Sequence, residues 1–317
     1  MLTTRGRLLI LTYHRVCPQP DALITGNAYA GGFRRQMQLL ARAFNVLPLV
    51  EAVERMHAGT LPSRAVCITF DDGYADNAEV AAPILAEYGL PATFFIATGF
   101  LDGGRMWNDT LIETVRAAQG AELDLTAVGS GRFPIGSPAA RAATANELIG
   151  RCKYLEPAER LARVEGVAQA AGVSLPRDLM MRSDHVRALH AAGMEIGAHT
   201  VSHPILSATF PARAEEEIVA SRDRLAAITC AAVRAFAYPN GKPGVDYRSE
   251  HVEMVRRAGF TVAVSTVWAA AEAAHDRLQL PRIGFAETSR IVLGLKLLRA
   301  FSERTSTARV LPGYAEP

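Results

Sequence analysis

The sequence predicts an α/β fold, in which parallel strands form a distorted and incomplete barrel with helices outside. Short apolar segments alternate with segments of helical periodicity along most of the 317 residues, which predicts a mostly parallel sheet. Segments such as 65–70 and 93–97 are nearly continuously apolar, as strands are when both faces of a sheet are buried. Two of the strands run directly into polar residues, and the active sites of barrels lie at that end. These patterns alone do not separate a barrel from an open doubly wound sheet.

In the first hundred residues the pattern predicts strands that alternate with helices. Phe33, Met37 and Leu40 recur at helical spacing in one of the helices. Gly89 stops a later helix, and Pro91 follows shortly after it. The expected strands are residues 8–13, 46–47, 65–70 and 93–97, and the expected helices are residues 33–44, 49–57 and 76–88.

Residues 100–182 break this rhythm, because glycine-rich stretches separate three helical segments at about 109–118, 140–151 and 157–171. The alternation then resumes. It predicts helices at residues 183–192, 212–228, 247–258 and 289–300, and strands at residues 194–198, 235–238, 261–265 and 280–283. The polar tail, residues 303–317, is expected to fray.

The composition is that of a globular protein, with 49% hydrophobic and 7% aromatic residues. The formal net charge is +2 and the arginines are scattered, so we expect no nucleic-acid partner. No segment approaches the roughly 18 apolar residues of a membrane span. Arg5 and Arg7 precede an apolar run that is too short for a signal peptide, so we expect a cytoplasmic protein. The four cysteines form no CxxC pair and are expected to be reduced.

Asp71 and Asp72 end the predicted strand at residues 65–70 and precede Gly73. Neighbouring side chains of a strand point to opposite faces, so the two carboxylates share a site only if the backbone turns there, as Gly73 permits. The alternative is ordinary turn chemistry, with Asp72 or Asp76 capping the next helix. The pair therefore indicates metal chemistry only with a partner elsewhere in the chain.

His199 and His203 provide such a partner. They follow the predicted strand at residues 194–198 and lie four positions apart, so one helical turn or a tight loop brings both imidazoles together. With one carboxylate they form the three-ligand set of a catalytic zinc or other divalent ion, which leaves positions open for water and substrate. A histidine pair at this spacing also occurs in helical and capping roles, but here both motifs follow strand ends of one α/β fold.

Together these motifs resemble the polysaccharide deacetylase family, the NodB homology group of carbohydrate esterase family 4. The resemblance covers roughly residues 8–285 and rests on Thr69-Phe-Asp-Asp-Gly73, His199-Thr-Val-Ser-His203-Pro and Phe236-Ala-Tyr-Pro-Asn-Gly241. It implies an incomplete (β/α)7 barrel in a single domain over residues 1–302, with residues from about 100 to 182 as a helical insertion. It also implies that Asp71 is the general base and that a divalent ion, expected to be zinc, is held by Asp72, His199 and His203.

The general acid is less well defined by this resemblance. Many relatives carry it on a Leu-x-His strand near the C-terminus, but the last predicted strand, residues 280–283, has no histidine. His14 lies in Tyr13-His-Arg-Val16, which resembles the N-terminal Tyr-His signature of circularly permuted deacetylases, where that histidine replaces the C-terminal one. We therefore expect His14 to be the acid, the alternative being a hydrogen-bonded histidine at a strand end. We expect His275 to be an ordinary surface residue.

Another predicted strand ends at Tyr238, Pro239 and Asn240, which resemble the third motif of the family. There a backbone N–H after the proline helps to hold the oxyanion, and such a donor does not depend on the side chain. We therefore expect these three residues at the substrate. The arginine that normally orients the base is missing from this motif, and Arg282 and Arg234 are both open as its replacement.

Trp107 is either an aromatic platform for a sugar ring or part of the packing of the insertion. The whole pattern predicts a metal-dependent hydrolase that removes N-acetyl, or O-acetyl, groups from a hexosamine-containing polysaccharide or its biosynthetic precursor. A cytoplasmic location favours the precursor, as in exopolysaccharide biosynthesis. The alternatives are a hydrolase of a small non-peptide amide on the same scaffold and a catalytically impaired relic that binds glycan.

Overall fold

The computed structural model describes residues 4–24, 26–284 and 290–302, and the chain divides into two compact units. The first unit takes its described residues from Met1–Gln19, Asn27–Asp102 and Met181–Pro317. The second takes them from Pro20–Gly26 and Gly103–Met180. The predicted tail, residues 303–317, lies outside the described residues.

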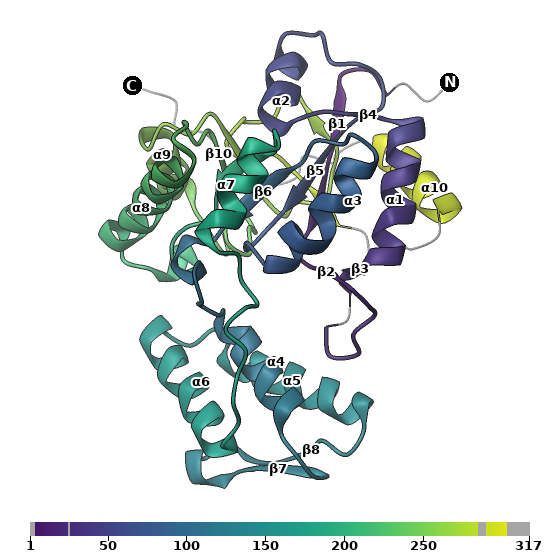
Figure 1. Ribbon diagram of the computed structural model, residues 1–317. Coiled ribbons are helices and arrows are strands. Elements are labelled where there is room, and N and C mark those ends of the chain that lie inside the picture. The colour runs from purple at the N-terminus through teal and green to yellow at the C-terminus, as the bar shows by residue number, and fades with distance from the viewer. Residues whose placement is uncertain (1–3, 25, 285–289, 303–317) are drawn as a thin grey trace. The chain divides into compact units, whose positions relative to one another are not determined.

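A curled sheet at the centre of the first unit confirms the predicted distorted, incomplete barrel (Figure 1). Its strands follow the order β11-β10-β9-β6-β5-β1-β12, and neighbours are parallel except β12, which is antiparallel to β1. Two short strands pair off this path, β4 with β5 and β13 with β1. The strands are β1 (Arg7–Tyr13), β4 (Asn45–Val46), β5 (Ala65–Phe70), β6 (Thr93–Ile96), β9 (Glu195–Ala198), β10 (Ala235–Ala237), β11 (Val262–Val264), β12 (Ala271–Glu272) and β13 (Ile283–Gly284).

The segment that ends in β13 connects two edges of this sheet. Leu280 forms a parallel bridge with Val264 of β11, and Ile283 pairs with Leu11 of β1. The predicted last strand at residues 280–283 is therefore shared between two neighbours. Because a few residues make this connection in place of a full strand, the barrel is distorted here.

Both faces of the sheet are buried, because alternate side chains of β1 enter different cores. Leu9 and Leu11 pack beneath the surrounding helices, whereas Leu8 and Ile10 face the barrel interior. The interior is closed at the amino ends of the strands by apolar side chains of α2 (Leu49–His57). This two-sided burial explains the continuous apolar runs of the sequence.

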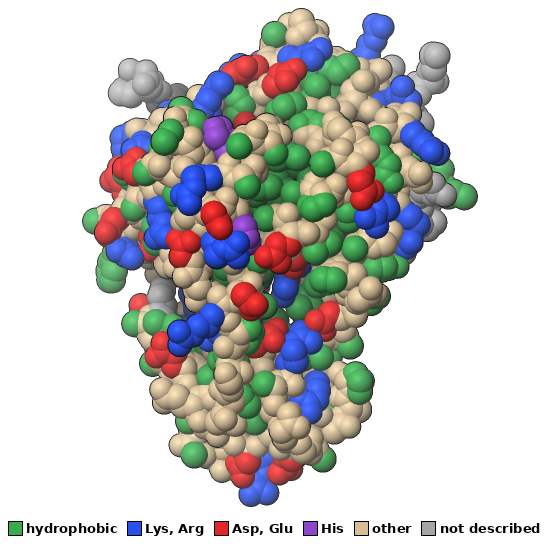
Figure 2. All heavy atoms as spheres, viewed as in Figure 1, with side chains coloured by type: hydrophobic (Ala, Val, Ile, Leu, Met, Phe, Trp, Pro, Cys, Tyr) green, Lys and Arg blue, Asp and Glu red, His purple; other side chains and the backbone are tan. Residues whose placement is uncertain are grey.

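Helices cover the outer face of the sheet (Figure 1). The predicted helix at residues 76–88 is present but begins with a π-helix, η1 (Asn77–Ala81), which leads into α3. None of the helices among the described residues is long and apolar enough to cross a membrane. On the face shown in Figure 2, basic and acidic side chains are intermingled, in keeping with the small net charge. The remaining helices of this unit are α1 (Ala30–Ala43), α3 (Ala82–Glu87), α7 (Ser183–Ala191), α8 (Pro211–Thr229), α9 (Ser249–Arg257) and α10 (Arg290–Ser302), with short 3₁₀ turns η2 (Thr98–Phe100) and η4 (Leu206–Ala208) and a small strand pair, β2 (Val16–Cys17) and β3 (Ala28–Tyr29).

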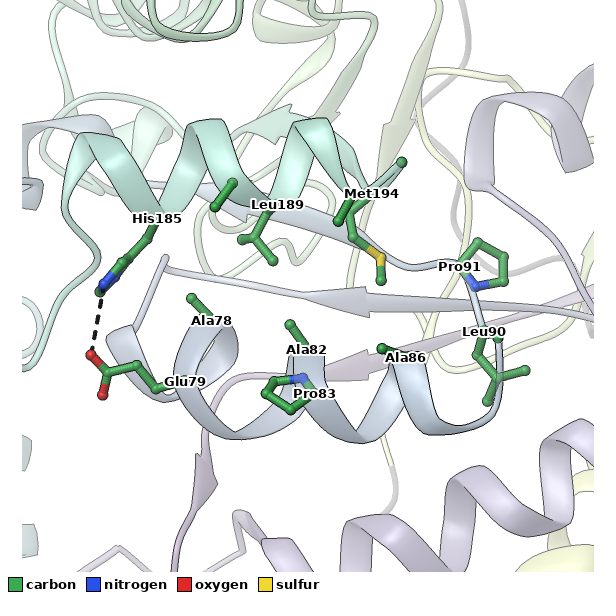
Figure 3. A pocket seen from close by; sticks show the side chains of 14 residues that line it. Ala78, Glu79, Ala82, Pro83, Ala86, Leu90, Pro91, His185, Leu189 and Met194 are labelled. Atoms are coloured by element: carbon green, nitrogen blue, oxygen red, sulfur yellow. Dashed lines mark ion pairs between the residues drawn. The ribbon is translucent and has the colours of Figure 1, made fainter.

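A groove of about 700 Å³ runs between the η1–α3 segment and α7 (Figure 3). Its lining is mainly alanine, proline and leucine side chains, and an ion pair between Glu79 and His185 (3.8 Å) lies at one end. The groove belongs to the helical layer outside the sheet. It therefore contains none of the predicted catalytic or metal-binding residues.

The second unit has its own apolar core, built from α4 (Trp107–Ala117), α5 (Pro138–Cys152), α6 (Pro157–Ala171) and a hairpin of β7 (Glu122–Leu125) and β8 (Gly131–Pro134), with the 3₁₀ turn η3 (Thr126–Val128) between its strands. The sequence predicted the three helices but missed the hairpin. Its strands have four residues each, and only Leu123, Leu125 and Phe133 are buried in them, too few for a clear period. The described residues of the segment 20–26, distant in the sequence, also belong to this unit. Asp21 in this segment forms an ion pair with Arg116 (2.7 Å).

Candidate active site

The parallel strands of the first unit end at a common edge, and this places distant motifs together. β1 and β5 pair along their length, and the Asp71 N–H donates to the Tyr13 carbonyl (2.9 Å). β6 and β9 pair in the same way, and the His199 N–H donates to the Ile96 carbonyl (3.1 Å). The residues that follow these strands therefore meet at the carboxyl edge of the sheet.

Asp72, His199 and His203 converge at this edge. One potential ligand atom from each residue lies within 4.8 Å of the others. The Nε2 atoms of both histidines lie 3.4 Å from Oδ1 of Asp72. One carboxylate oxygen and two imidazole nitrogens around one point are the donor set of a catalytic zinc or a related divalent ion.

The surroundings of these three residues fit a bound cation. Oδ1 of Asp72 is buried and has no hydrogen-bond partner, an arrangement that is costly unless another group satisfies it. Nδ1 of His199 lies 2.7 Å from the carbonyl oxygen of Ala237, to which it donates a hydrogen bond. This bond places the proton on Nδ1 and leaves a lone pair on Nε2, which lies on the side of Asp72. A histidine that binds a metal has the same arrangement.

A left-handed turn allows the two adjacent aspartates to share the site. Asp72 has φ of 76° and Gly73 has φ of 85°, so the chain leaves the strand geometry at the second carboxylate. A Cβ on Gly73 would lie 3.0 Å from a side-chain atom of Ile96. The turn therefore depends on glycine both for its conformation and for its close approach to β6.

The protonation states around this point suit a cation site. Burial alone raises the pKa of Asp72, but His199 and His203 outweigh it and hold that pKa well below its usual range. Burial lowers the pKa of His203 to about 4, which keeps its imidazole neutral at neutral pH. Burial also acts to lower the pKa of His199, but the neighbouring carboxylates of Asp72 and Asp71 raise it overall. Metals bind the ionised carboxylate and the neutral imidazole, so a bound cation would displace any proton that the carboxylates draw to His199.

Asp71 is held by an arginine that the sequence left open. Arg282 makes a bidentate ion pair with it, with both N–O distances at 2.7 Å and side-chain exposures of 1% and 4%. Burial raises the pKa of Asp71, but the Arg282 charge lowers it below its ordinary value overall. Arg234, the other candidate, is exposed and pairs with Glu54, so Arg282 is the arginine that orients Asp71.

His14 follows β1 at the same edge of the sheet and is exposed. It lies near enough to Asp71 and Asp72 to contribute to the lowering of the pKa of both carboxyl groups. Its carbonyl accepts a hydrogen bond from Asn77 (2.8 Å). The next residues are held as well, because Asp76 accepts bonds from the Arg15 side chain (2.7 Å) and the Val16 N–H (3.1 Å).

His275 lies at the other end of the sheet. It follows β12, which pairs with Arg7 and Leu8 at the start of β1, whereas His14 follows the end of β1. The seven residues of β1 span six steps of about 3.3 Å each, so the two ends lie about 20 Å apart. The His275 ring takes part in a local hydrogen bond, because its Nδ1 accepts a hydrogen bond from the Glu272 N–H (3.0 Å).

The segment Tyr238, Pro239 and Asn240 follows β10 at the carboxyl edge. Asn240 is partly exposed, with φ of 57°, and its N–H makes no hydrogen bond with another group in the described chain. Tyr238 must be corrected as a predicted substrate contact. Its side chain is completely buried and stacks on Tyr247 with ring centres 3.8 Å apart, so it faces the helices.

Trp107 belongs to the second unit and starts α4. Its ring packs against the apolar core of that unit, and the guanidinium of Arg160 lies 5.0 Å from the ring centre. These contacts support the packing alternative for Trp107.

Sequence reasoning missed the residues that support the ligands from a distance. Glu217 on α8 accepts hydrogen bonds from the segment between the two histidines, yet nothing in the local sequence marks it. Arg282 carried a weak signal, because it lies within the last predicted strand, residues 280–283. Only the pairing of the segment 280–284 with both β11 and β1 places it beside Asp71.

The curled α/β barrel and the Asp-His-His set at its carboxyl edge define a hydrolase of the deacetylase type. The chain belongs to the polysaccharide deacetylase family, because the family's sequence model matches residues 58–126 and 132–263, more than half of the chain.

Comparisons with individual proteins are consistent with membership of this family. YxkH of Bacillus subtilis, named among polysaccharide deacetylases, is 32% identical over 92 residues, and the match spans 29% of this chain and 32% of that protein. The structure of the Streptococcus pyogenes deacetylase PplD is similar, with a TM-score of 0.63, 21% identity and coverage of 92% of this chain and 98% of that one. IcaB from Ammonifex degensii gives a TM-score of 0.59 at 18% identity, covering 92% and 97%. At these identities the structures show the shared fold, and the circularly permuted type stays a prediction.

Proposed function

We propose that this protein is a divalent-metal-dependent deacetylase that removes N-acetyl, or O-acetyl, groups from a hexosamine-containing polysaccharide or its biosynthetic precursor. The observation that carries the proposal is the convergence of Asp72, His199 and His203 on one point, directly beside Asp71. A buried, ionised carboxylate next to a cation site is the arrangement that hydrolysis of an acetyl group needs.

When bound, a divalent ion, expected to be zinc from the nitrogen and carboxylate donors, polarises the acetyl carbonyl and acidifies water. Asp71 accepts the proton of the attacking water as general base. Its ion pair with Arg282 keeps the carboxylate ionised in spite of its burial and fixes its orientation.

Two further groups serve the later stages of the reaction. His14, exposed at the same edge, donates a proton to the departing amine as imidazolium. The Asn240 N–H, which has no partner within the described chain, donates a hydrogen bond to the developing oxyanion. Tyr238 and Pro239 place this N–H by anchoring the segment in the core.

The choice of an acetylated glycan rests on the family and its relatives. The chain matches the polysaccharide deacetylase family, and the structure of PplD is that of a complex with acetate, the product of deacetylation. Acetate release is therefore the activity to test. The partner we propose is an N-acetylated glycan or glycan precursor.

The experiment uses the whole protein, stripped of metal with a chelator and reloaded with zinc. We expect acetate release from N-acetylglucosamine oligosaccharides by the reloaded protein, but not by the stripped protein or by Asp71→Asn. Hydrolysis of small amides alone would favour the amidase alternative. Tight glycan binding with one zinc per chain and no acetate release would favour the impaired relic.

A further inference from the structure

A buried carboxylate on α8, Glu217, holds the segment between the two histidines, and its side chain is 1% exposed. Its Oε2 accepts hydrogen bonds from the N–H groups of Val201 (2.9 Å) and Ser202 (2.7 Å). Its Oε1 accepts the Ser202 hydroxyl (2.8 Å) and a guanidinium N–H of Arg213 (3.0 Å). One side chain thus satisfies two consecutive backbone donors that no helix or strand satisfies.

The segment that Glu217 holds has an uncommon backbone conformation. Thr200 has φ of 64° and His203 has φ of 53°, and neither is glycine. Such residues persist in the left-handed region only where the surrounding structure fixes them. The His203 N–H also donates to the Thr200 hydroxyl (3.1 Å), so the bend is closed from within.

The other side of the segment is fixed by η2, the short turn that follows β6. The Thr98 N–H donates to the Thr200 carbonyl (3.1 Å). The Gly99 N–H donates to the Val201 carbonyl (2.7 Å), and a Cβ on Gly99 would lie only 2.7 Å from that oxygen. Two carbonyl groups of the segment are therefore held by η2, and two of its N–H groups are held by Glu217.

The two histidines depend on this segment to different degrees. His199 is bonded in register with β6, and its ring donates to the Ala237 carbonyl. In the described part of the chain, the His203 ring has no such hydrogen bond; it lies against the His199 ring, with ring centres 4.7 Å apart, and beside Asp72. The orientation of the His203 ring therefore depends on the backbone conformation of His203. That conformation depends in turn on Ser202 and on the groups that hold Ser202 in place.

We infer that Glu217 is a positioning residue for the metal site: by holding Val201 and Ser202, it presets His203 before an ion binds. The inference rests on the proposed metal dependence. Residues of this kind, which act on a ligand without touching the metal, typically change metal affinity by about 10–100-fold when altered.

The test is a zinc titration of the metal-free protein in competition with a chromophoric chelator of known affinity. We expect zinc affinity to fall by about 10–100-fold in Glu217→Gln, which keeps the size of the side chain but loses one acceptor. The matched control is Glu216→Gln. Glu216 also pairs with Arg213 (2.7 Å), but its side chain is 63% exposed and makes no hydrogen bond with the segment among the described residues. The zinc affinity of Glu216→Gln should therefore match that of the unaltered protein.

Two further variants keep the inference open to refutation if Glu217→Gln folds poorly. Ser202→Ala removes one bond to Glu217 and should weaken zinc binding by a smaller factor, while Glu217→Asp should restore part of the lost affinity. Thermal unfolding of the metal-free proteins shows which variants are folded. At saturating zinc, we expect the kcat of Glu217→Gln to recover towards that of the unaltered protein, as it would not if Glu217 acted in the chemical step.

Unchanged zinc affinity in folded Glu217→Gln and Ser202→Ala would overturn the role of Glu217 and leave the proposed function standing. If the unaltered protein binds no zinc, both fail together. If the variants bind zinc more weakly but neither they nor the unaltered protein release acetate, the positioning role of Glu217 is supported and only the proposed deacetylase activity is overturned.

Discussion

Strand β9 begins with Glu195 and is followed by His199, and the polar groups at the two ends of this strand are paired in opposite ways. At the amino end, the carboxylate of Glu195 accepts hydrogen bonds from Leu49 N–H (3.0 Å) and the Thr93 hydroxyl (2.8 Å). At the carboxyl end, Oδ1 of Asp72 is buried without a partner and faces two imidazole nitrogens. The protein itself supplies hydrogen-bond donors to the carboxylate at the amino end, but its described residues supply none to Oδ1 of Asp72 at the carboxyl end.

The pKa values of the two carboxyl groups show what this difference means. Burial raises the pKa of Glu195, and the hydrogen bonds from Thr93 and the start of α2 offset it only in part. Asp72 is more deeply buried, yet His199 and His203 hold its pKa well below the usual range. The amino end is thus arranged to tie α2 to the sheet, and the carboxyl end to hold positive charge that the chain itself does not supply.

The largest effect should follow from removing a ligand at the carboxyl end. In His199→Ala we expect loss of stoichiometric zinc and of all detectable acetate release, because two remaining donors do not form the three-ligand set. Metal content measured by mass spectrometry on the purified protein checks this. Full zinc occupancy in His199→Ala would show that the ligand assignment is wrong.

The next effect separates chemistry from metal binding at the same end. Asp71→Asn keeps the shape of the side chain but cannot accept a proton, so turnover should fall by roughly 10²–10⁴ with zinc retained. Steady-state kinetics of acetate release at saturating zinc measure this. Turnover near that of the unaltered protein would remove Asp71 from the role of base.

A comparison of two histidines tests the ends of the sheet directly. His14→Ala should lower turnover by about 10²-fold without loss of zinc, as expected for removal of a general acid. His275→Ala, at the amino end, should leave turnover unchanged. Equal losses in both variants would point to a general effect on folding, and a loss in His275→Ala alone would reverse the assignment.

The sequence revealed the parts of this site that local spacing encodes. Asp71, Asp72, His199 and His203 each follow an apolar strand, and the carboxyl ends of parallel strands meet at one edge. The strands themselves were predictable because burial on both faces makes them continuously apolar. This same feature hid the orientation of Tyr238, because a strand with two buried faces does not show which side chain points to the barrel mouth.

What the sequence could not reveal depends on contacts between distant segments. Arg282 reaches Asp71 across 211 residues of chain, and only the pairing of its segment with both edges of the sheet selects it over Arg234. Glu217 acts on backbone N–H groups, which leave no pattern in the amino-acid sequence. The hairpin of the second unit was missed because its strands have four residues each and bury too few side chains to show an alternating period.

The smallest predicted effect lies at the amino end, in Glu195→Gln. The folded-state pKa of Glu195 is raised above its ordinary value of 4.5, so the folded protein favours the neutral form. The stability that this group contributes is therefore fully present below pH 4.5 and is lost as the pH rises through the raised pKa. Glutamine stays neutral, so the free energy of unfolding of the variant should lack this dependence and differ by about 1 kcal/mol, the scale of one hydrogen bond.

Denaturant unfolding of both proteins from pH 4 upwards, within the range where each still folds, measures that difference. Zinc content and acetate release should be unchanged, because Glu195 lies at the opposite end of β9 from His199. A loss of zinc in Glu195→Gln would show that the two ends are coupled through β9. A difference in unfolding free energy that does not vary with pH would show that Glu195 is ionised equally in the folded and unfolded chains. In that case its hydrogen bonds from α2 and Thr93 would fully offset its burial.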